Sequence, residues 1–294
     1  MLPIAIIASS ILTASALGLV GFIYYVTRQN YIPQRIPITK YPKDIGLDFT
    51  NVEIDIRGVT MRGWFIPVLH SAENGKGKPI IILFHGWASN AQYLLPYTKM
   101  IHDAGFQSLA LNARGHGESD KIDHMSFLRY CEDVRSAIQY VESNFPSSPI
   151  ALWGHSFGAG AVVVVGAEHP NIKAIAANAA FADFTHLAKT MLGWVKIPGF
   201  FSPVVTTIWE KSTGAKLEDW NPHAHALRAK NHLLAFHGGR DRIISPRHSQ
   251  WLVENAKGRV DARCIILKKV NHFNFHDSPE YQKELIDFLN KYLK

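Results

Sequence analysis

Cysteine is scarce in this chain, with only Cys131 and Cys264 among its 294 residues. The two do not form a Cys-x-x-Cys pair, and a disulfide between them cannot be inferred. The chain also has no Asn-x-Ser/Thr sequon, an absence compatible with a protein that never meets the glycosylation machinery. We therefore expect two buried free thiols, which suit a reducing compartment.

Runs of basic residues are missing as well. The formal net charge is +7, yet no five Lys or Arg residues stand in a row, and no recognisable nucleic-acid-binding motif is present. We therefore predict that the protein does not bind nucleic acid. Two readings of the charge remain: a solvated surface with a few extra lysines, or a surface that lies against anionic lipid headgroups.

The first 27 residues lack charge altogether. Met1–Thr27 is dominated by Ile, Leu, Ala, Val and Phe, and about 20 such residues suffice for a helix to cross a bilayer. Tyr24 and Tyr25 stand near its end, where interfacial aromatic residues are expected. A signal peptide cleaved near Ala14-Ser15-Ala16 is the alternative. Because the segment lacks a positively charged start and its apolar run continues past that site, we predict an uncleaved transmembrane anchor at 1–27.

Basic residues dominate the linker 28–49 that follows the predicted anchor. The first acidic residue of the chain, Asp44, comes only after Arg28, Arg35, Lys40 and Lys43. Because basic residues favour the cytoplasmic side of a membrane, we predict a single-pass membrane protein whose domain at 50–294 is cytoplasmic. Export of that domain to the other side is the alternative.

Strand and helix patterns alternate along residues 50–294, without an internal repeat. The patterns predict a hairpin over 51–57 and 60–68 that turns at Gly58, then strands near 80–84, 107–111, 149–154, 172–178, 232–237 and 262–267. Helices are predicted near 90–103, 127–144, 157–169, 247–256 and 279–293. Such alternation is typical of the α/β class, with one mainly parallel sheet covered by helices on both faces.

The stretch 181–230 interrupts this alternation between two predicted strands. Its large aromatic residues stand among prolines and glycines: Trp194, Phe200, Phe201, Trp209 and Trp220. We predict an inserted cap whose aromatic side chains either anchor it to the body or form an apolar pocket beneath it. His223-x-His225 lies in the same stretch without a nearby Cys or a third ligand, so we predict no metal site and no cofactor.

The most informative motif is Gly154-His155-Ser156-Phe157-Gly158. A short apolar strand precedes it, and a helix rich in Ala and Val follows it. Gly-x-Ser-x-Gly at a strand-to-helix turn presents a serine hydroxyl as a nucleophile, and the small residues on either side let strand and helix approach each other. The motif alone is also compatible with a structural turn, but its context favours Ser156 as a catalytic nucleophile.

A serine nucleophile needs a base, and the base needs a group that orients it. Asp241 and His272 each follow a predicted strand, and the ends of parallel strands meet at one edge of a sheet. We therefore predict His272 as the base and Asp241 as the orienting carboxylate. His276, four residues further on, is the alternative base, and Asp183, after the preceding strand, is the alternative acid.

The loop after the strand at 80–84 reads His85-Gly86-Trp87-Ala88-Ser89-Asn90. A developing oxyanion needs hydrogen-bond donors, and we predict that the backbone N–H groups of Trp87 and Phe157 supply them. His85 is predicted to be a buried imidazole that braces the loop.

Taken together, the segments around His85, Ser156, Asp241 and His272 resemble the α/β-hydrolase superfamily, as does Arg114-Gly115-His116-Gly117-Glu118-Ser119. The pattern is most similar to the serine hydrolases that include monoacylglycerol lipases and membrane-attached Bem46-like proteins, and it covers about residues 50–294. The resemblance implies the α/β-hydrolase fold and a Ser156–His272–Asp241 triad. One departure is Asn112, since relatives usually carry an acid two residues before the arginine of this loop.

We therefore expect a membrane-anchored serine hydrolase that cleaves carboxylic esters with apolar acyl chains through an acyl-enzyme. Its partners would be a small ester or lipid substrate and the membrane itself. We expect the anchor to take no part in the chemistry. A thioesterase, an amidase or a peptidase of the same fold is an alternative, and so is a tethered binding protein without catalytic activity.

Overall fold

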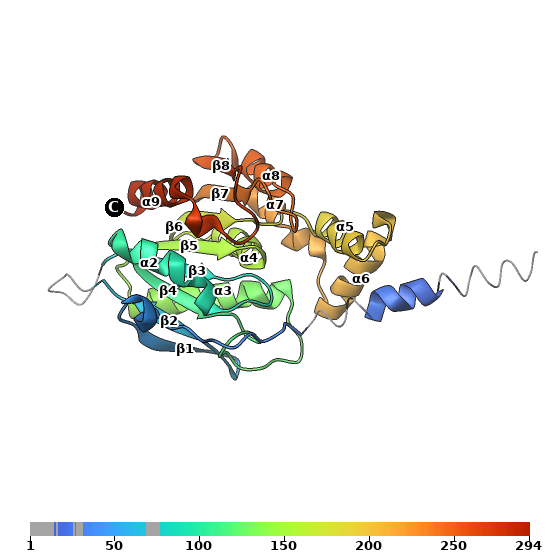
Figure 1. Ribbon diagram of the computed structural model, residues 1–294, viewed down its shortest axis with the longest axis horizontal. Helices are drawn as coiled ribbons and strands as arrows, with labels where there is room; N and C mark the ends of the chain where they lie inside the picture. Colours follow the sequence, from blue (N-terminus) through green and yellow to red (C-terminus); the bar gives the residue numbers. More distant parts are fainter. Residues whose placement is uncertain (1–14, 16, 26, 28–31, 69–76) are drawn as a thin grey trace, which may run out of the picture.

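A single sheet lies at the centre of the computed structural model, which describes residues 15, 17–25, 27, 32–68 and 77–294 (Figure 1). Its eight strands in the described residues are β1 Thr50–Ile56, β2 Val59–Ile66, β3 Ile80–Phe84, β4 Gln107–Asn112, β5 Ile150–His155, β6 Ile172–Asn178, β7 His232–Gly238 and β8 Ala262–Leu267. They are ordered β1-β2-β4-β3-β5-β6-β7-β8. Only β2 runs antiparallel to its neighbours β1 and β4, so the predicted mainly parallel sheet is confirmed.

The opening hairpin turns where the sequence predicts. Ile56 pairs with Val59 across the turn, and the two residues between them, Arg57 and Gly58, have φ angles of 55° and 83°. Positive φ at both central positions gives the turn a twist that matches that of the strands, and glycine adopts it without steric cost.

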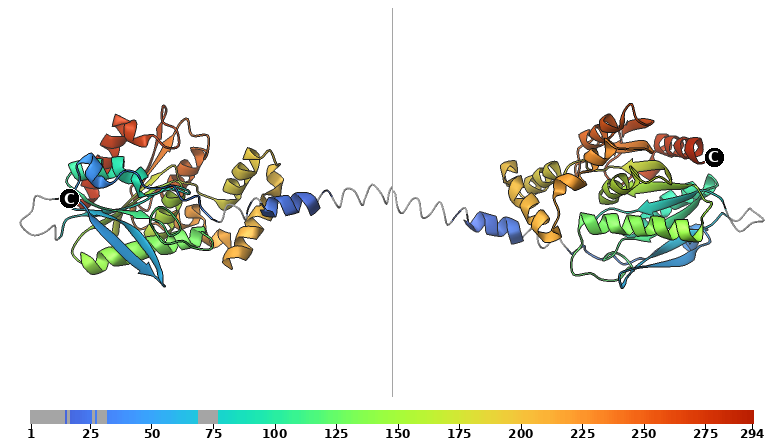
Figure 2. Two further views of the ribbon diagram at one scale, coloured as in Figure 1. Left: turned by 60° about the horizontal axis from the view of Figure 1, so that its bottom comes forward. Right: turned by 180° about the vertical axis from the view of Figure 1, so that it is seen from behind.

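Helices cover both faces of the sheet, as Figures 1 and 2 show. Helices α3 (Phe127–Asn144), α4 (Phe157–Gly166) and α8 (Arg247–Ala256) contribute to the core on one face. On the other face lie α2 (Leu95–Asp103), which follows the 3-10 turn η2 (Ala91–Leu94), and α9 (Pro279–Leu293), which follows η5 (Phe275–Asp277). The elements predicted at 90–103 and 157–169 are therefore present but shorter as α-helices.

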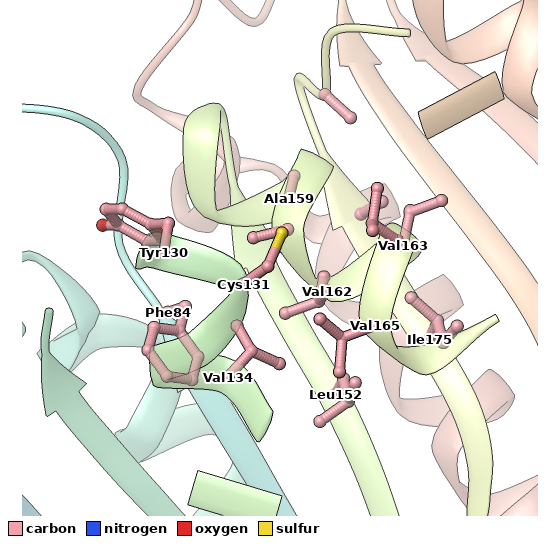
Figure 3. Close-up of a cluster of buried hydrophobic side chains, with 14 of the residues drawn as sticks. Phe84, Tyr130, Cys131, Val134, Leu152, Ala159, Val162, Val163, Val165 and Ile175 are labelled. Atoms are coloured by element: carbon pink, nitrogen blue, oxygen red, sulfur yellow. The ribbon is translucent and has the colours of Figure 1, made fainter. Parts of the chain in front are cut away.

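The central strands are buried on both sides. In β3, Ile80 and Ile82 pack into the core on one face of the sheet, whereas Ile81 and Leu83 pack into the core on the other. This explains why the strand is a continuous apolar run. Figure 3 shows the core around α4, where Cys131 of α3 is one of the buried side chains. Both cysteines are free, but Cys264 is only half-buried, so the prediction of buried thiols is right for Cys131 alone.

The stretch 181–230 forms a helical cap between β6 and β7. It contains α5 (Phe184–Trp194), η3 (Gly199–Phe201), α6 (Ser202–Thr213), η4 (Leu217–Trp220) and α7 (Pro222–Ala226). Helices α5 and α6 project beyond the end of the sheet (Figure 1). Its aromatic residues differ in their surroundings. Trp220 contacts the body of the domain at Arg135 of α3, whose guanidinium lies 5.3 Å from the ring centroid. Phe200, in contrast, is 73% exposed.

A helical segment that includes residues 17–25 lies beside α5 and α6 (Figure 1). The greater part of the anchor predicted at 1–27 lies outside the described residues, and among the described ones no helix is both long and apolar enough to cross a membrane. Farther along, η1 (Pro42–Ile45) and the buried Leu47 pack against the body. Much of the predicted linker at 28–49 is thus in contact with the domain.

Candidate active site

Ser156 occupies a sharp turn between β5 and α4. Its backbone has φ 53° and ψ −114°, a conformation that costs energy in a non-glycine residue. A Cβ on Gly154 would lie 2.6 Å from the carbonyl oxygen of Gly158, and a Cβ on Gly158 would lie 2.4 Å from that of His85. The prediction that only small residues fit two positions before and two positions after this serine is confirmed. The turn holds Ser156 at the carboxyl end of a central strand.

Asp241 and His272 meet beyond the carboxyl ends of β7 and β8. The Nδ1 of His272 lies 2.6 Å from the Oδ2 of Asp241, and the two side chains are only 5% and 0% exposed. A carboxylate at Nδ1 accepts the proton on that nitrogen, which leaves Nε2 as the free acceptor in the neutral ring. The structure therefore brings together the predicted acid and the predicted base in the geometry of a catalytic pair.

The Asp241 carboxylate has partners on both of its oxygens. Oδ1 accepts hydrogen bonds from the backbone N–H groups of Ile243 at 2.8 Å and Ile244 at 2.9 Å, while Oδ2 also lies 3.2 Å from His237 Nε2. Burial alone would raise the pKa of Asp241, but hydrogen bonds from His237, His272 and the backbone hold it well below its ordinary value. Asp241 therefore stays ionised beside His272.

Ser156 and His272 line the same cavity, which has a volume of about 330 Å³, within the range of small-molecule sites. Most of the other side chains around it are apolar. They come from the sheet edge, from α3 and from the cap, and include Trp87, Met125, Phe127, Leu128, Phe157, Phe181, Phe184, Leu187, Met191, Trp194, Trp209, Leu217, Ile243, Ile244 and Phe273. The cavity therefore offers an apolar ligand a place next to the serine.

The loop after β3 lies directly against the serine turn. A Cβ on Gly86 would lie 3.1 Å from the Cβ of Ser156, and the Trp87 ring contacts the Phe157 ring with centroids 5.3 Å apart. Phe157 is the first residue of α4, where backbone N–H groups have no intrahelical acceptor. Both residues predicted to donate to an oxyanion thus border Ser156.

His85 is fully buried and joins this loop to its surroundings. Its Nε2 accepts a hydrogen bond from the backbone N–H of Ala113 at 3.1 Å, and the Tyr130 hydroxyl donates to its carbonyl oxygen at 2.7 Å. Burial and the neighbouring His116 hold the pKa of His85 well below its ordinary value, so the ring is neutral. These contacts agree with the predicted bracing role.

The alternative acid and base from the sequence are engaged elsewhere. The Asp183 carboxylate caps α5, accepting from the backbone N–H of His186 at 2.8 Å. His276 packs edge-on against the Tyr97 ring, with centroids 5.6 Å apart. Neither is among the described residues that line the cavity. The geometry favours Asp241 and His272.

Asn112 stands where the resemblance to the α/β hydrolases implies an acid, and its side chain makes two hydrogen bonds. Its Oδ1 accepts from the backbone N–H of Ala91 at 2.7 Å, and its Nδ2 donates to the carbonyl oxygen of Arg62 at 3.2 Å. A carboxylate could not make the second bond, because it has no proton to donate. An asparagine at position 112 therefore fits the hydrogen bonds of this loop, and an aspartate would lose one of them.

His223 and His225 each bond to a backbone carbonyl. His223 Nδ1 lies 2.8 Å from the carbonyl oxygen of Ala182, and His225 Nε2 lies 3.0 Å from that of Asp219. In the described part of the chain, no three His, Cys, Asp or Glu side chains are grouped to hold a metal ion. Hydrogen bonds within the cap thus occupy one ring nitrogen of each histidine.

Two residues at the site did not emerge from the sequence. Thr27, within the predicted anchor, lines the cavity together with Ser156; whether the anchor takes no part in the chemistry, as we expect, stays a prediction. His237 contacts Asp241 from four residues upstream. The i, i+4 spacing was the only signal for His237, and no signal existed for Thr27, because its contacts are with residues distant in sequence.

Comparisons with known proteins agree with this geometry. A family model described as serine aminopeptidase, S33, matches residues 75–220, which contain the serine turn and most of the cap. An uncharacterized 31.7 kDa protein of Escherichia coli is 29% identical over 185 residues, covering 62% of this chain and 58% of the relative. The chain thus spans a little over half the length of that relative. A monoacylglycerol lipase of Mycolicibacterium smegmatis is 33% identical over 93 residues, covering 31% of this chain and 33% of the lipase.

The fold has close counterparts among solved structures. The Pyrococcus furiosus esterase Pf2001 superposes with a TM-score of 0.69 at 21% identity, covering 89% of this chain and 100% of the esterase. At this identity the similarity shows the fold alone. A mainly parallel sheet with a strained serine turn after its central strand and a His–Asp pair at the same edge defines a class of hydrolases. The chain belongs to the α/β-hydrolase superfamily, and its matches there include a monoacylglycerol lipase and an esterase.

Proposed function

We propose that this protein is a serine esterase that cleaves carboxylic esters with apolar acyl chains. The observation that carries the proposal is the 2.6 Å contact between His272 Nδ1 and Asp241 Oδ2, at the edge of the cavity that Ser156 lines as well. This pairing fixes the histidine tautomer that can accept a serine proton. A binding protein that only held a ligand would have no need of it.

The reaction proceeds in two steps. His272 Nε2 takes the proton of Ser156 as its Oγ attacks the ester carbonyl, and the backbone N–H groups of Trp87 and Phe157 stabilise the oxyanion. His272 then returns the proton to the leaving alcohol, which leaves an acyl-enzyme. A water molecule activated by His272 hydrolyses that intermediate. Throughout, ionised Asp241 stabilises the imidazolium.

The walls of the cavity support an apolar acyl group. Leu187 and Met191 of α5 and Trp209 of α6 all face it, and burying an acyl chain against such side chains is favourable by about 0.8 kcal/mol per methylene. No Asp or Glu is among the described residues that line it. An aminopeptidase would need a negative partner for the amino group of its substrate, so the walls favour an ester over a peptide with a free amino terminus.

A panel of substrates tests the reaction class. Pure full-length protein should hydrolyse chromogenic esters faster than the matching thioesters and amides, and it should react covalently with a fluorophosphonate probe. Faster thioester or amide hydrolysis would move the assignment to the thioesterase or amidase alternative. Well-folded protein that neither hydrolyses nor reacts would favour a binding protein.

We further propose that the N-terminal segment attaches the protein to a membrane, with the hydrolase domain on the cytoplasmic side. The support is the absence of charge from Met1 to Thr27 and the basic residues that follow. The protein should then stay in the membrane pellet after washing with alkaline carbonate. Protease added to intact cells should leave residues 50–294 uncut. Release by carbonate would refute the attachment, and digestion would reverse the orientation.

A further inference from the structure

The helical segment at the N-terminus is docked on the cap. Ile23 is only 2% exposed, and it packs in a cluster with Ala188 and Leu192 of α5 and Val205 of α6. Leu19, one turn earlier, packs against the same cluster. Full burial of an isoleucine side chain contributes about 1.5–3 kcal/mol. The segment is therefore in specific contact with the cap, although about 160 residues separate Ile23 from α5 in the sequence.

The docked segment reaches the cavity through Thr27. This residue is 4% exposed and lines the cavity that also contains Ser156 and His272. Its Oγ1 donates a hydrogen bond to the carbonyl oxygen of Ile23 at 2.7 Å. Because the hydroxyl proton is used within the segment, Thr27 contributes a largely apolar surface to the cavity.

One face of the segment carries all of these contacts. Leu19, Ile23 and Thr27 are four residues apart, so in a helix they fall on one side. In contrast, Phe22 is 50% exposed and Tyr25 is 61% exposed. The chain thus offers matched control positions next to the docked ones.

Helix α5 connects the docked segment with the cavity. Ala188 and Leu192 contact the segment, whereas the neighbouring Leu187 and Met191 line the cavity. Trp209 of α6 does both, because it packs against the Ile23 cluster and also lines the cavity. Helices α5 and α6 thus join the docked segment to side chains that line the cavity.

We propose that the N-terminal segment that carries Ile23 and Thr27 is a wall of the acyl pocket and helps to set which acyl chains the enzyme accepts. The inference rests on the proposed esterase function, since it names the specificity of that same site. The segment acts in two ways. Thr27 limits the depth of the pocket, and Ile23 holds the cap helices in the position that buries the chain.

Thr27→Trp tests the first role. The added ring would occupy space near Thr27, where we place the end of a longer acyl chain. With full-length protein in detergent micelles, 4-nitrophenyl esters from acetyl to octanoyl should show a ratio of octanoyl to acetyl kcat/KM at least tenfold below wild type. Tyr25→Trp places the same indole at an exposed position of the segment and should keep the wild-type ratio. An unchanged ratio in Thr27→Trp would overturn the proposal.

Ile23→Asp tests the second role, because a charge in the apolar cluster opposes docking. The octanoyl to acetyl ratio should fall by about fourfold for every methylene that loses its burial, which corresponds to about 0.8 kcal/mol. Phe22→Asp places the same charge on the exposed face and should leave the ratio at the wild-type value. Equal ratios in the two variants would contradict the proposal.

Hydrogen exchange separates a failure of this inference from a failure of the esterase assignment. Backbone amides of α5 should exchange faster in Ile23→Asp than in wild type and Phe22→Asp. Unchanged exchange would refute the docking, whatever the activity. If wild type hydrolyses no ester and takes no fluorophosphonate, the esterase assignment fails and the pocket role fails with it, while faster exchange in Ile23→Asp would still support the docking itself.

Discussion

The Nε2 of His237 lies 3.2 Å from the Oδ2 of Asp241, the same carboxylate oxygen that faces His272. On its other side, His237 Nδ1 lies 2.7 Å from the Ser249 hydroxyl, and the His237 side chain is fully buried. His237 therefore reaches the acid from within the protein, whereas His272 reaches it from the cavity. His237 Nε2 also lies 2.9 Å from the carbonyl oxygen of Ile244, so a proton on Nε2 is shared between that carbonyl and the carboxylate against which His272 is oriented.

Replacement of His237 should slow the chemical step. His237→Ala removes a donor that the Ile244 carbonyl and the ionised Asp241 share. A full hydrogen bond to a charged group is worth about 1.5–3 kcal/mol, so we expect kcat to fall by up to about 100-fold with little change in KM. His237→Gln can place an amide donor near the lost Nε2 and should recover part of the rate. Steady-state kinetics on one ester measure both constants. A raised KM with normal kcat would show that His237 supports binding instead.

The identity of the acid can be tested by a pair of substitutions. Asp241→Asn should keep the fold but lower kcat by about 10⁴-fold, because an amide at this position favours the wrong tautomer of His272. Asp183→Asn should have nearly normal kcat, since the Asp183 side chain caps α5 and an asparagine can do the same. The opposite pattern of rates would assign the orienting role to Asp183.

Gly158, two residues after the serine, should not tolerate any side chain. In Gly158→Ala the new Cβ would lie 2.4 Å from the carbonyl oxygen of His85 and 2.7 Å from that of Phe84. Relief of this overlap requires backbone shifts, and we expect a loss of about 1–3 kcal/mol in the free energy of unfolding. Gly193→Ala in α5 is the control, because nothing lies within 4 Å of its Cβ, and it should gain about 0.5–1 kcal/mol. Urea unfolding of both variants measures the difference, and a Gly158→Ala protein as stable as wild type would contradict this packing.

Stability should fall in mild acid because of buried histidines. Burial lowers the pKa of His116 to about 4, of His155 to about 3 and of His248 to about 4. Between the ordinary value of about 6.5 and these lower values, the unfolded chain binds protons that the folded protein does not. Each histidine should therefore lower the free energy of unfolding by about 2 kcal/mol between pH 7 and pH 5.

His248→Asn isolates one of these contributions. The Asn oxygen can still accept the hydrogen bond that His248 Nδ1 receives from the backbone N–H of Ala182 at 3.1 Å, but asparagine does not titrate. Urea unfolding at pH 7 and pH 5 should show a loss of stability smaller than that of wild type by about 2 kcal/mol. An equal loss in both proteins would show that His248 does not contribute to the acid sensitivity.

Local sequence patterns predicted the fold and the position of Ser156 because short-range sterics determine both. A continuous apolar run indicates a strand that is buried on both faces. Glycines stand two residues before and two residues after Ser156 because a side chain there would overlap with the backbone. The sites after β7 and β8 followed from topology, since parallel strands end at one edge. At Asn112, the sequence showed that an amide stands where the resemblance implies an acid. It could not show the two hydrogen bonds of that amide, because their partners lie in η2 and β2.

The contacts of Thr27 could not be predicted in the same way. A chain of uncharged apolar residues has the same pattern whether it faces lipid or protein, because both surroundings are apolar. The spacing of Leu19, Ile23 and Thr27 indicates a docked face only once α5 and α6 are known to lie beside the segment. Unlike Asp241 and His272, Thr27 does not follow a strand of the sheet, so topology gave no indication of its place.

The central claim is that Ser156 is the nucleophile, and covalent labelling tests it most directly. Purified full-length protein and its Ser156→Ala variant should be treated with a fluorophosphonate probe and analysed by intact mass, with matching circular dichroism spectra as proof of folding. We predict that wild type gains one probe adduct, mapped to the peptide that contains residue 156, and that Ser156→Ala gains none and has no esterase activity. Labelling of Ser156→Ala equal to that of wild type would contradict the account.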